Sequence, residues 1–152
     1  HLGLNSHAIV LMNAGKLQVE FNAQGILAER IRAGGAGLGG VLSDIGVGTE
    51  LADGKQTCEH GGKTFLIESA LRADIALLHA DTADAFGNLR YCATARNFNP
   101  LMAMAAGRVV VEAETLVSNG ELGADDIHTT GIFVDQVVQL QVVSEEYAVV
   151  QR

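Results

Sequence analysis

The chain has 152 residues, of which 48% are hydrophobic, so it is long enough and apolar enough for one folded domain with its own core. Eighteen glycines against a single proline favour closely packed helices and strands joined by tight turns. A formal net charge of −8 argues against nucleic acid as a partner, because neutralising phosphates needs a basic surface.

The first half of the chain, to residue 80, predicts three strands and one helix. Residues 16–21 alternate apolar and polar side chains, which is typical of a half-buried strand. Residues 25–33 place Ile26, Leu27 and Ile31 at helical spacing and end at the glycine-rich stretch 34–40, which predicts a short helix followed by a turn or a ligand loop. Residues 64–68 and 74–80 read as strands, the second apolar enough to be buried on both faces.

The second half continues the alternation of strands and helices. Residues 82–88 carry turn residues and lead into a short strand at 89–91, and residues 99–106 predict a helix with Asn99 as its N-cap and Pro100 at its first position. Strands are predicted at 108–112 and 131–140, and residues 142–152 form either an extra strand or a C-terminal tail. We therefore expect a single α/β domain over residues 1–152 with three layers.

The chain has no apolar run near the ~18 residues that a membrane span needs, so we expect no membrane partner. It has two cysteines, Cys58 and Cys92. With no signal-like start, this composition predicts a reduced, cytoplasmic compartment. Residues 1–4 begin without an initiator methionine, so we expect the chain to start inside a larger protein.

The glycine cluster at residues 34–40 has two interpretations. Gly35, Gly37 and Gly40 have the spacing of a dinucleotide-binding fingerprint, but that fingerprint needs a strand before it and a helix after it. Here a predicted helix precedes the glycines, which argues against NAD or FAD. A glycine-rich turn with no ligand and a loop that lets the backbone approach a ligand both remain open.

Two other groups of polar residues occupy predicted element junctions. Residues 96–100 (RNFNP) join a strand to a helix; a cap and a hydrophobic staple explain Asn99 and Phe98 but leave Arg96 and Asn97 unexplained. Gln24 follows a predicted strand, where its amide could donate to a developing oxyanion or could be ordinary surface.

The sequence offers no evident metal site or covalent catalyst. Cys58 and His60 form a pair without a third and fourth ligand at a convincing spacing, and His79 at a strand end is typical of a packed histidine. There is no G-x-S-x-G elbow, and neither Glu29 nor Glu68 belongs to an evident acid pair. The chain therefore predicts binding chemistry without its own nucleophile.

Four stretches together resemble a known family. Residues 28–37 (AERIRAGGAG), 46–49 (GVGT), 87–89 (GNL) and 95–100 (ARNFNP) are similar, in order and spacing, to the α half of class I, 3-oxoacid type coenzyme A transferases. The resemblance runs from about residue 2 to residue 140. The continuation of the glycine run as Leu38-Gly39-Gly40 is closest to subunits that act on acetate, acetoacetate and butyrate, whereas residues 43–45 (SDI) depart from the usual Thr-Pro-Thr.

This resemblance implies a fold and a mode of action. The expected fold is a three-layer α/β/α arrangement on an open, mostly parallel sheet, lacking its first strand-helix unit, which would lie upstream of His1. Such enzymes move CoA between carboxylic acids by ping-pong chemistry, through a glutamyl-CoA thioester on a β subunit. The resemblance thus implies a β-subunit partner in an α2β2 hetero-oligomer, with acyl-CoA and short carboxylic acids as substrates, CoA as cosubstrate, no permanently bound cofactor and no metal.

The resemblance also implies roles for individual residues. Gln24 matches the glutamine that donates to the oxyanion. The residues that face substrate or CoA, or line the subunit junction, would be Gly34, Gly35, Ala36, Gly37, Arg96, Asn97, Phe98 and Asn99. Two other functions remain open: a non-catalytic acyl-CoA or nucleotide-binding module of the same fold, and a relative of sugar-phosphate isomerases, for which no acid and base pair is evident.

Overall fold

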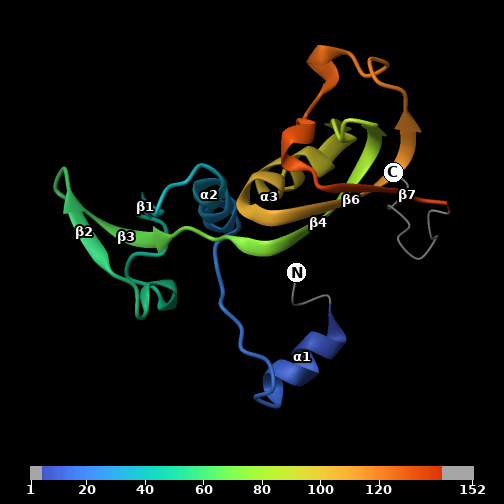
Figure 1. Cartoon of the computed structure of the whole chain (residues 1–152). Helices are drawn as coiled ribbons and strands as arrows, with labels where there is room; N and C mark the ends of the chain where they lie inside the picture. The colour runs from blue at the N-terminus through green and yellow to red at the C-terminus, as the bar shows by residue number, and fades with distance from the viewer. Residues whose placement is uncertain (1–4, 142–152) are drawn as a thin grey trace.

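The computed structural model describes residues 5–141, and its strands form two sheets (Figure 1). Helices α1 (Ser6–Asn13) and α2 (Gln24–Gly35) precede the first five strands, and α3 (Asn99–Ala105) lies between the fifth and sixth strands. The extra strand or tail predicted for residues 142–152 lies outside the described residues. None of the helices within residues 5–141 combines the length and the apolarity that a membrane crossing needs.

A small antiparallel sheet is built from β1 (Gly40–Ser43), β3 (Lys63–Ser69) and β2 (Thr57–His60), in that order. His60 pairs with Lys63, so Gly61 and Gly62 alone make the hairpin turn, with φ of 59° and 75°. A two-residue turn with both φ values positive matches the twist of its strands and favours glycine. The strand predicted at 64–68 is confirmed as part of β3, while β1 and β2 were not predicted.

The larger sheet has four strands in the order β5-β4-β6-β7. The long strands β4 (Ala73–Asp84) and β6 (Ala106–Val117) run parallel, β7 (Gln136–Gln139) runs parallel to β6, and only the two-residue β5 (Leu89–Arg90) is antiparallel. Helix α3 lies in the connection from β4 to β6. The predicted α/β class with a mostly parallel sheet is therefore confirmed.

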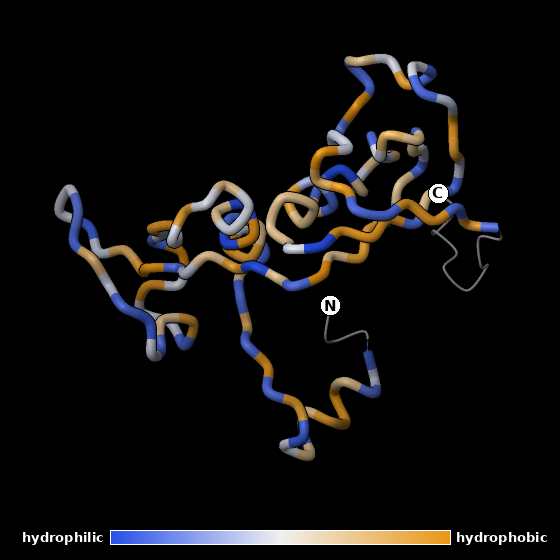
Figure 2. Tube along the Cα trace, in the orientation of Figure 1, coloured by the Kyte–Doolittle hydropathy of each residue, from blue (hydrophilic) through white to orange (hydrophobic). Residues whose placement is uncertain are grey.

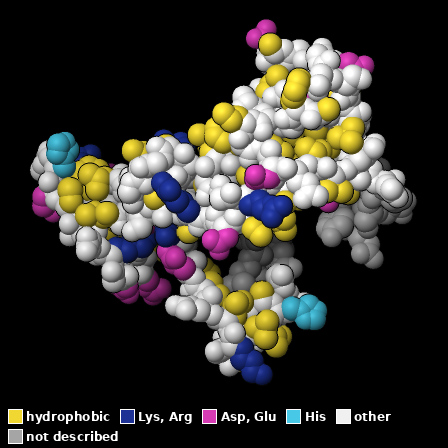
Figure 3. All heavy atoms as spheres, viewed as in Figure 1, with side chains coloured by type: hydrophobic (Ala, Val, Ile, Leu, Met, Phe, Trp, Pro, Cys, Tyr) yellow, Lys and Arg dark blue, Asp and Glu magenta, His cyan; other side chains and the backbone are white. Residues whose placement is uncertain are grey.

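The core lies between this sheet and α3. Alternate residues of β4 and β6 point toward the helix, among them Leu78, Val109 and Val111, and Ala103 of α3 packs against them. The other face of the sheet is exposed in the part of the chain that the structure describes: Leu77 is 75% and Ile75 56% exposed. Figure 2 shows hydrophobic residues along the central strands, and Figure 3 shows hydrophobic side chains on the surface.

Two predicted strands need correction. Residues 16–21 are irregular, with Phe21 61% exposed, because no neighbouring strand in residues 5–141 accepts their hydrogen bonds, and alternation alone cannot hold a strand. In Figure 1 this segment is the extended link between α1 and α2. The strand predicted at 131–140 is shorter, because Gly131–Phe133 forms a 3₁₀ turn before β7 begins at Gln136.

Helix α2 packs at its C-terminal end through two glycines. A Cβ atom on Gly34 would lie 2.1 Å from the carbonyl oxygen of Leu71, and one on Gly35 would lie 2.6 Å from the Cβ atom of Met104 in α3. Both distances are shorter than any side-chain contact allows. These glycines let α2 approach the β3–β4 connection and α3 at backbone distance.

Replacing Gly34 with alanine tests this packing. The helix gains roughly 1 kcal/mol of intrinsic propensity, but the new methyl group meets a backbone oxygen that cannot move aside, so we expect a net destabilisation of about 1–3 kcal/mol. The control is Gly39→Ala, since a Cβ atom there meets nothing within 4 Å. Urea denaturation of both variants measures the difference; equal midpoints would show that α2 shifts freely.

Candidate functional site

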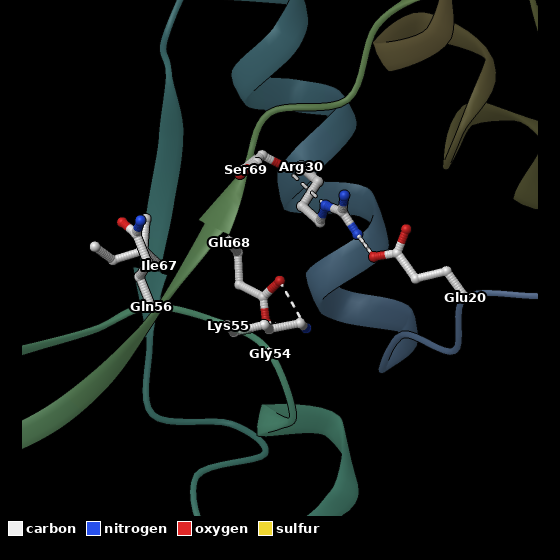
Figure 4. A pocket seen from close by; sticks show the side chains of 8 residues that line it. All are labelled: Glu20, Arg30, Gly54, Lys55, Gln56, Ile67, Glu68 and Ser69. Carbon is white, nitrogen blue, oxygen red and sulfur yellow. Dashed lines mark hydrogen bonds and ion pairs between the residues drawn. The ribbon is translucent and has the colours of Figure 1, made fainter.

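A polar pocket of about 330 Å³ lies between α2 and β3 (Figure 4). Its lining is charged rather than apolar. The polar side chains come from the segment before α2, from α2 itself, from the loop before β2 and from β3: Glu20, Arg30, Lys55, Gln56, Glu68 and Ser69. Two cations and two carboxylates therefore face one space, and their formal charges cancel.

Glu68 and Lys55 form one of the two ion pairs in this pocket. Alternation along β3 turns Glu68 toward the same buried side as Leu66, and only 2% of the glutamate side chain is exposed. The ammonium of Lys55 donates to both carboxylate oxygens, at 2.7 and 2.9 Å. Because an unpaired buried carboxylate is costly, Lys55 is what allows a charge at this position.

Arg30 forms the second pair and binds three residues in two segments. Its Nε donates to the carbonyl oxygen of Ser69 at 2.8 Å, and its Nη1 donates to the Glu20 carboxylate and to the Asn22 amide oxygen, the latter at 2.8 Å. The hydrogen bond from Arg30 holds the pKa of Glu20 below its ordinary value, against the opposing effect of burial. Arg30 thus fastens the irregular segment before α2 to the helix and to β3.

Gln24 lies at the first position of α2 and is exposed. The N-cap residue is Ala23, whose side chain makes no capping hydrogen bond. Gln24 is two residues beyond Asn22, which Arg30 holds. The structure therefore presents the Gln24 amide at the surface, at the end of α2 nearest the polar pocket.

The four predicted residues at the other end of α2 divide into two pairs. Gly34 and Gly35 make the close packing contacts described above, whereas Ala36 and Gly37 are exposed, with Gly37 at φ +74° just beyond the helix. A 12-residue helix is about 18 Å long, so these residues and Gln24 lie at opposite ends of α2.

The predicted residues at 96–99 lie where a 3₁₀ turn (Ala93–Arg96) meets α3. Arg96 and Asn97 are exposed. The N-cap prediction for Asn99 is wrong: the N-cap is Phe98, Asn99 is the first helical residue, and its side-chain amide donates to the carbonyl oxygen of Ala95 at 2.9 Å. Local bonding to the preceding turn has replaced capping.

The structure does not bring the three predicted groups into one pocket. None of them lines the polar pocket, and Asn99 lines a separate pocket with His79 and Glu112. Sequence reasoning also missed the ion pairs. Arg30 lies on the buried stripe of α2, four residues after Ile26 and three before Ala33, and Glu68 lies two residues after Leu66 on the buried side of β3. Those spacings were the available signal.

His79 on the exposed sheet face is bracketed by two carboxylates. Its Nδ1 lies 3.2 Å from Glu112 and its Nε2 2.9 Å from Glu114, and the register of β4 and β6 places His79 opposite Glu112. Burial lowers the pKa of His79, but hydrogen bonds to Glu114 and Glu112 outweigh it, so the pKa lies above the ordinary 6.5. The imidazolium form, with both ring nitrogens donating, fits this site.

The cysteines and the remaining candidate metal ligands lie apart. Cys58 is half-buried and His60 is exposed on β2, and Cys92 is exposed near α3. Over residues 5–141, no three side chains of His, Cys, Asp or Glu come together in a way that could hold a metal ion.

The coenzyme A transferase family profile matches residues 4–140. The chain is 50% identical over 149 residues to the alpha-type subunit of a probable coenzyme A transferase of Bacillus subtilis, covering 97% of this chain and 65% of the relative. It is 48% identical to the alpha-type subunit of the acetate CoA-transferase of Escherichia coli, covering 93% of this chain and 64% of the relative. With the A-type subunit of a probable succinyl-CoA:3-ketoacid coenzyme A transferase of B. subtilis it shares 50% identity over 82% of this chain and 52% of that protein.

Solved structures agree with the sequence comparison. An acyl-CoA transferase from E. coli O157:H7, in a thioester complex with CoA, superposes with a TM-score of 0.79 at 25% identity, over 93% of this chain and 31% of that one. The glutaconate coenzyme A-transferase of Acidaminococcus fermentans shares the fold, with a TM-score of 0.77 at 21% identity, over 86% of this chain and 48% of that one.

The chain belongs to the coenzyme A transferase family. Within the family it resembles the subunits of the alpha or A type, since the three curated relatives above are all of that type. The chain spans just under two thirds of the two alpha-type relatives and about half of the A-type relative.

Replacing Lys55 with methionine tests the buried pair. Glu68 would keep a buried charge without its counter-ion, and we expect a destabilisation of about 3 kcal/mol, because breaking a buried pair on one side is strongly unfavourable. The control is Lys63→Met, which removes an exposed lysine from β3. Urea denaturation measures both, and the double variant Lys55→Met, Glu68→Leu should recover most of the loss. Equal stability of wild type and Lys55→Met would contradict the role given to this pair.

Replacing His79 with glutamine tests the charged histidine. Because the folded-state pKa of His79 is raised, the stability it contributes is fully present below its unfolded pKa near 6.5 and is lost as the pH rises through the folded-state pKa. We expect wild-type stability to fall relative to His79→Gln across that pH range. Thermal melts of both proteins at a series of pH values measure the difference, and parallel curves would argue against the raised pKa.

Proposed function

We propose that this chain is the α-type part of a CoA-transferase that moves CoA between a short-chain acyl-CoA or 3-oxoacyl-CoA, such as acetoacetyl-CoA, and a carboxylic acid such as acetate. The main support for this proposal is the match of residues 4–140 to the family, together with 48–50% identity to subunits of the alpha and A types. The similarity to part of an acetate CoA-transferase supports the short-chain choice. The proposed setting is the cytoplasm, with a β-type partner in an α2β2 assembly.

The proposed reaction divides the chemistry between two polypeptides. A glutamate carboxylate of the β partner attacks the acyl-CoA carbonyl, and the CoA thiolate leaves as a mixed anhydride forms. The thiolate then attacks the glutamyl carbonyl, which releases the first carboxylate and leaves a glutamyl-CoA thioester. A second carboxylate reverses these steps and departs as the new acyl-CoA. Charge develops on the carbonyl oxygen at each attack, so a fixed N–H donor accelerates the reaction.

This chain would supply that donor and part of the pocket wall. In the proposal, Gln24 donates its side-chain N–H to the oxyanion, and its exposed position on α2 leaves the amide accessible to a pocket shared with the partner. Ala36, Gly37, Arg96 and Asn97 are exposed and so could contact CoA or the partner. Gly34 and Gly35 would act indirectly, by holding α2 in place.

The assay uses the protein produced together with a β-type CoA-transferase subunit from the same organism. Acetoacetyl-CoA and acetate should yield acetyl-CoA, and borohydride should trap the glutamyl thioester on the β partner. Succinate in place of acetate distinguishes the acetate branch from the succinyl branch. Binding of acyl-CoA with neither transfer nor a trapped thioester would overturn the proposal in favour of a non-catalytic binding module.

Replacing Gln24 with alanine in that complex should lower kcat about 100- to 1,000-fold, which is the usual cost of one lost oxyanion donor. The matched control is Gln18→Ala, an exposed glutamine in the segment before α2, for which we expect wild-type kcat. Steady-state kinetics measure both variants. An unchanged kcat for Gln24→Ala would assign the oxyanion to another donor.

A further inference from the structure

Besides its ion pair with Glu20, Arg30 makes two further hydrogen bonds, to Ser69 and Asn22. Its side chain is about nine-tenths buried, yet its hydrogen bonds run to a main-chain oxygen of β3 and to two side chains in the segment before α2. The Glu20 side chain is 62% exposed, so that ion pair is largely open to solvent. The Asn22 amide oxygen, which accepts from Arg30, carries no formal charge. Asn22 is two residues before Gln24 in the sequence.

The start of α2 is anchored by the buried Ile26, but no side chain caps it. Ala23 offers no side-chain cap, and residues 16–23 form no helix or strand of their own. Asn22 and Gln24 precede that anchor, and Gln24 is exposed, so without a bond from elsewhere these residues would be free to fray. Arg30 comes from the second turn of the same helix and is itself fixed to Ser69, while its own carbonyl oxygen accepts from the Leu71 backbone N–H at 2.9 Å.

We infer that Arg30 is a positioning residue for Gln24, acting through Asn22; this rests on the proposed function. Arg30 transfers the fixed position of β3 to the segment that enters α2, and so sets where the Gln24 amide points. An oxyanion donor is effective only when its N–H is aimed in advance at the developing charge, and a displacement of about 1 Å costs roughly 100-fold in rate. Gln24 donates the hydrogen bond to the oxyanion, and Arg30 and Asn22 fix the direction of the Gln24 side chain.

The experiment measures kcat and KM of the assembled transferase for four variants. Asn22→Ala removes the amide oxygen that Arg30 binds and leaves the other bonds of Arg30 in place. Asn22→Asp keeps an acceptor oxygen. Arg30→Lys keeps the charge but loses the forked geometry. The matched control is Arg32→Ala, which removes an arginine of the same helix that pairs only with the exposed Glu29 in the described residues.

We expect Asn22→Ala and Arg30→Lys to lower kcat roughly 10- to 100-fold with little change in KM, because the donor is misaimed while substrate binding is kept. Asn22→Asp and Arg32→Ala should keep wild-type kcat. In a Gln24→Ala background, Asn22→Ala should cause no further loss, because the residue through which it acts is already gone.

Each contrary result has one meaning. A normal kcat for Asn22→Ala, together with a slow Gln24→Ala, overturns the positioning role and leaves the proposed function intact. A loss from Asn22→Ala that persists in the Gln24→Ala background also overturns it, since the effect then does not pass through Gln24. A normal kcat for Gln24→Ala removes the oxyanion role and the inference with it. If Arg30→Lys fails to fold, Asn22→Ala decides alone.

Discussion

The close contact between α2 and the connection at Leu71 organises the described structure. The Leu71 N–H donates to the carbonyl oxygen of Arg30, and its own carbonyl oxygen lies where Gly34 has no side chain. Leu71 belongs to the short connection that links the antiparallel sheet to the mostly parallel sheet. One helix is thereby fixed to the point at which the two sheets join, and Gly35 extends the contact to α3. The relative arrangement of these elements depends on the C-terminal end of α2, where Gly34 and Gly35 carry no side chains.

The sequence predicted the elements that local patterns determine. The helix at 25–33 and the strands at 64–68, 74–80 and 108–112 follow from the spacing of apolar residues, and all four occur in α2, β3, β4 and β6. The strand expected at 16–21 depended on a partner that no local pattern can supply. The sequence also did not predict that the strands divide into two sheets, because strand pairing depends on segments that are distant in the sequence.

In the candidate site, too, local patterns predicted some features and missed those that depend on distant segments. Some residues that the resemblance assigned, such as Gln24 and Arg96, are exposed, whereas Gly34 is buried against the Leu71 backbone. The charged residues of the polar pocket are different: Arg30 and Glu68 are buried and satisfied by partners far away in the sequence. Burial of a charge is predictable from a helical or strand spacing, but its partner is not, since Lys55 and Ser69 reach the pocket from separate loops and strands.

The bare face of the larger sheet bears on how this chain behaves in solution. Within residues 5–141, Leu77 and Ile75 are exposed on β4, and only the two residues of β5 pair with β4 on the side away from β6. An apolar stripe beside unpaired main-chain groups is the kind of surface that drives colloidal self-attraction. Dilute samples and a net charge of −8 oppose that attraction, whereas salt screens the charge and favours precipitation.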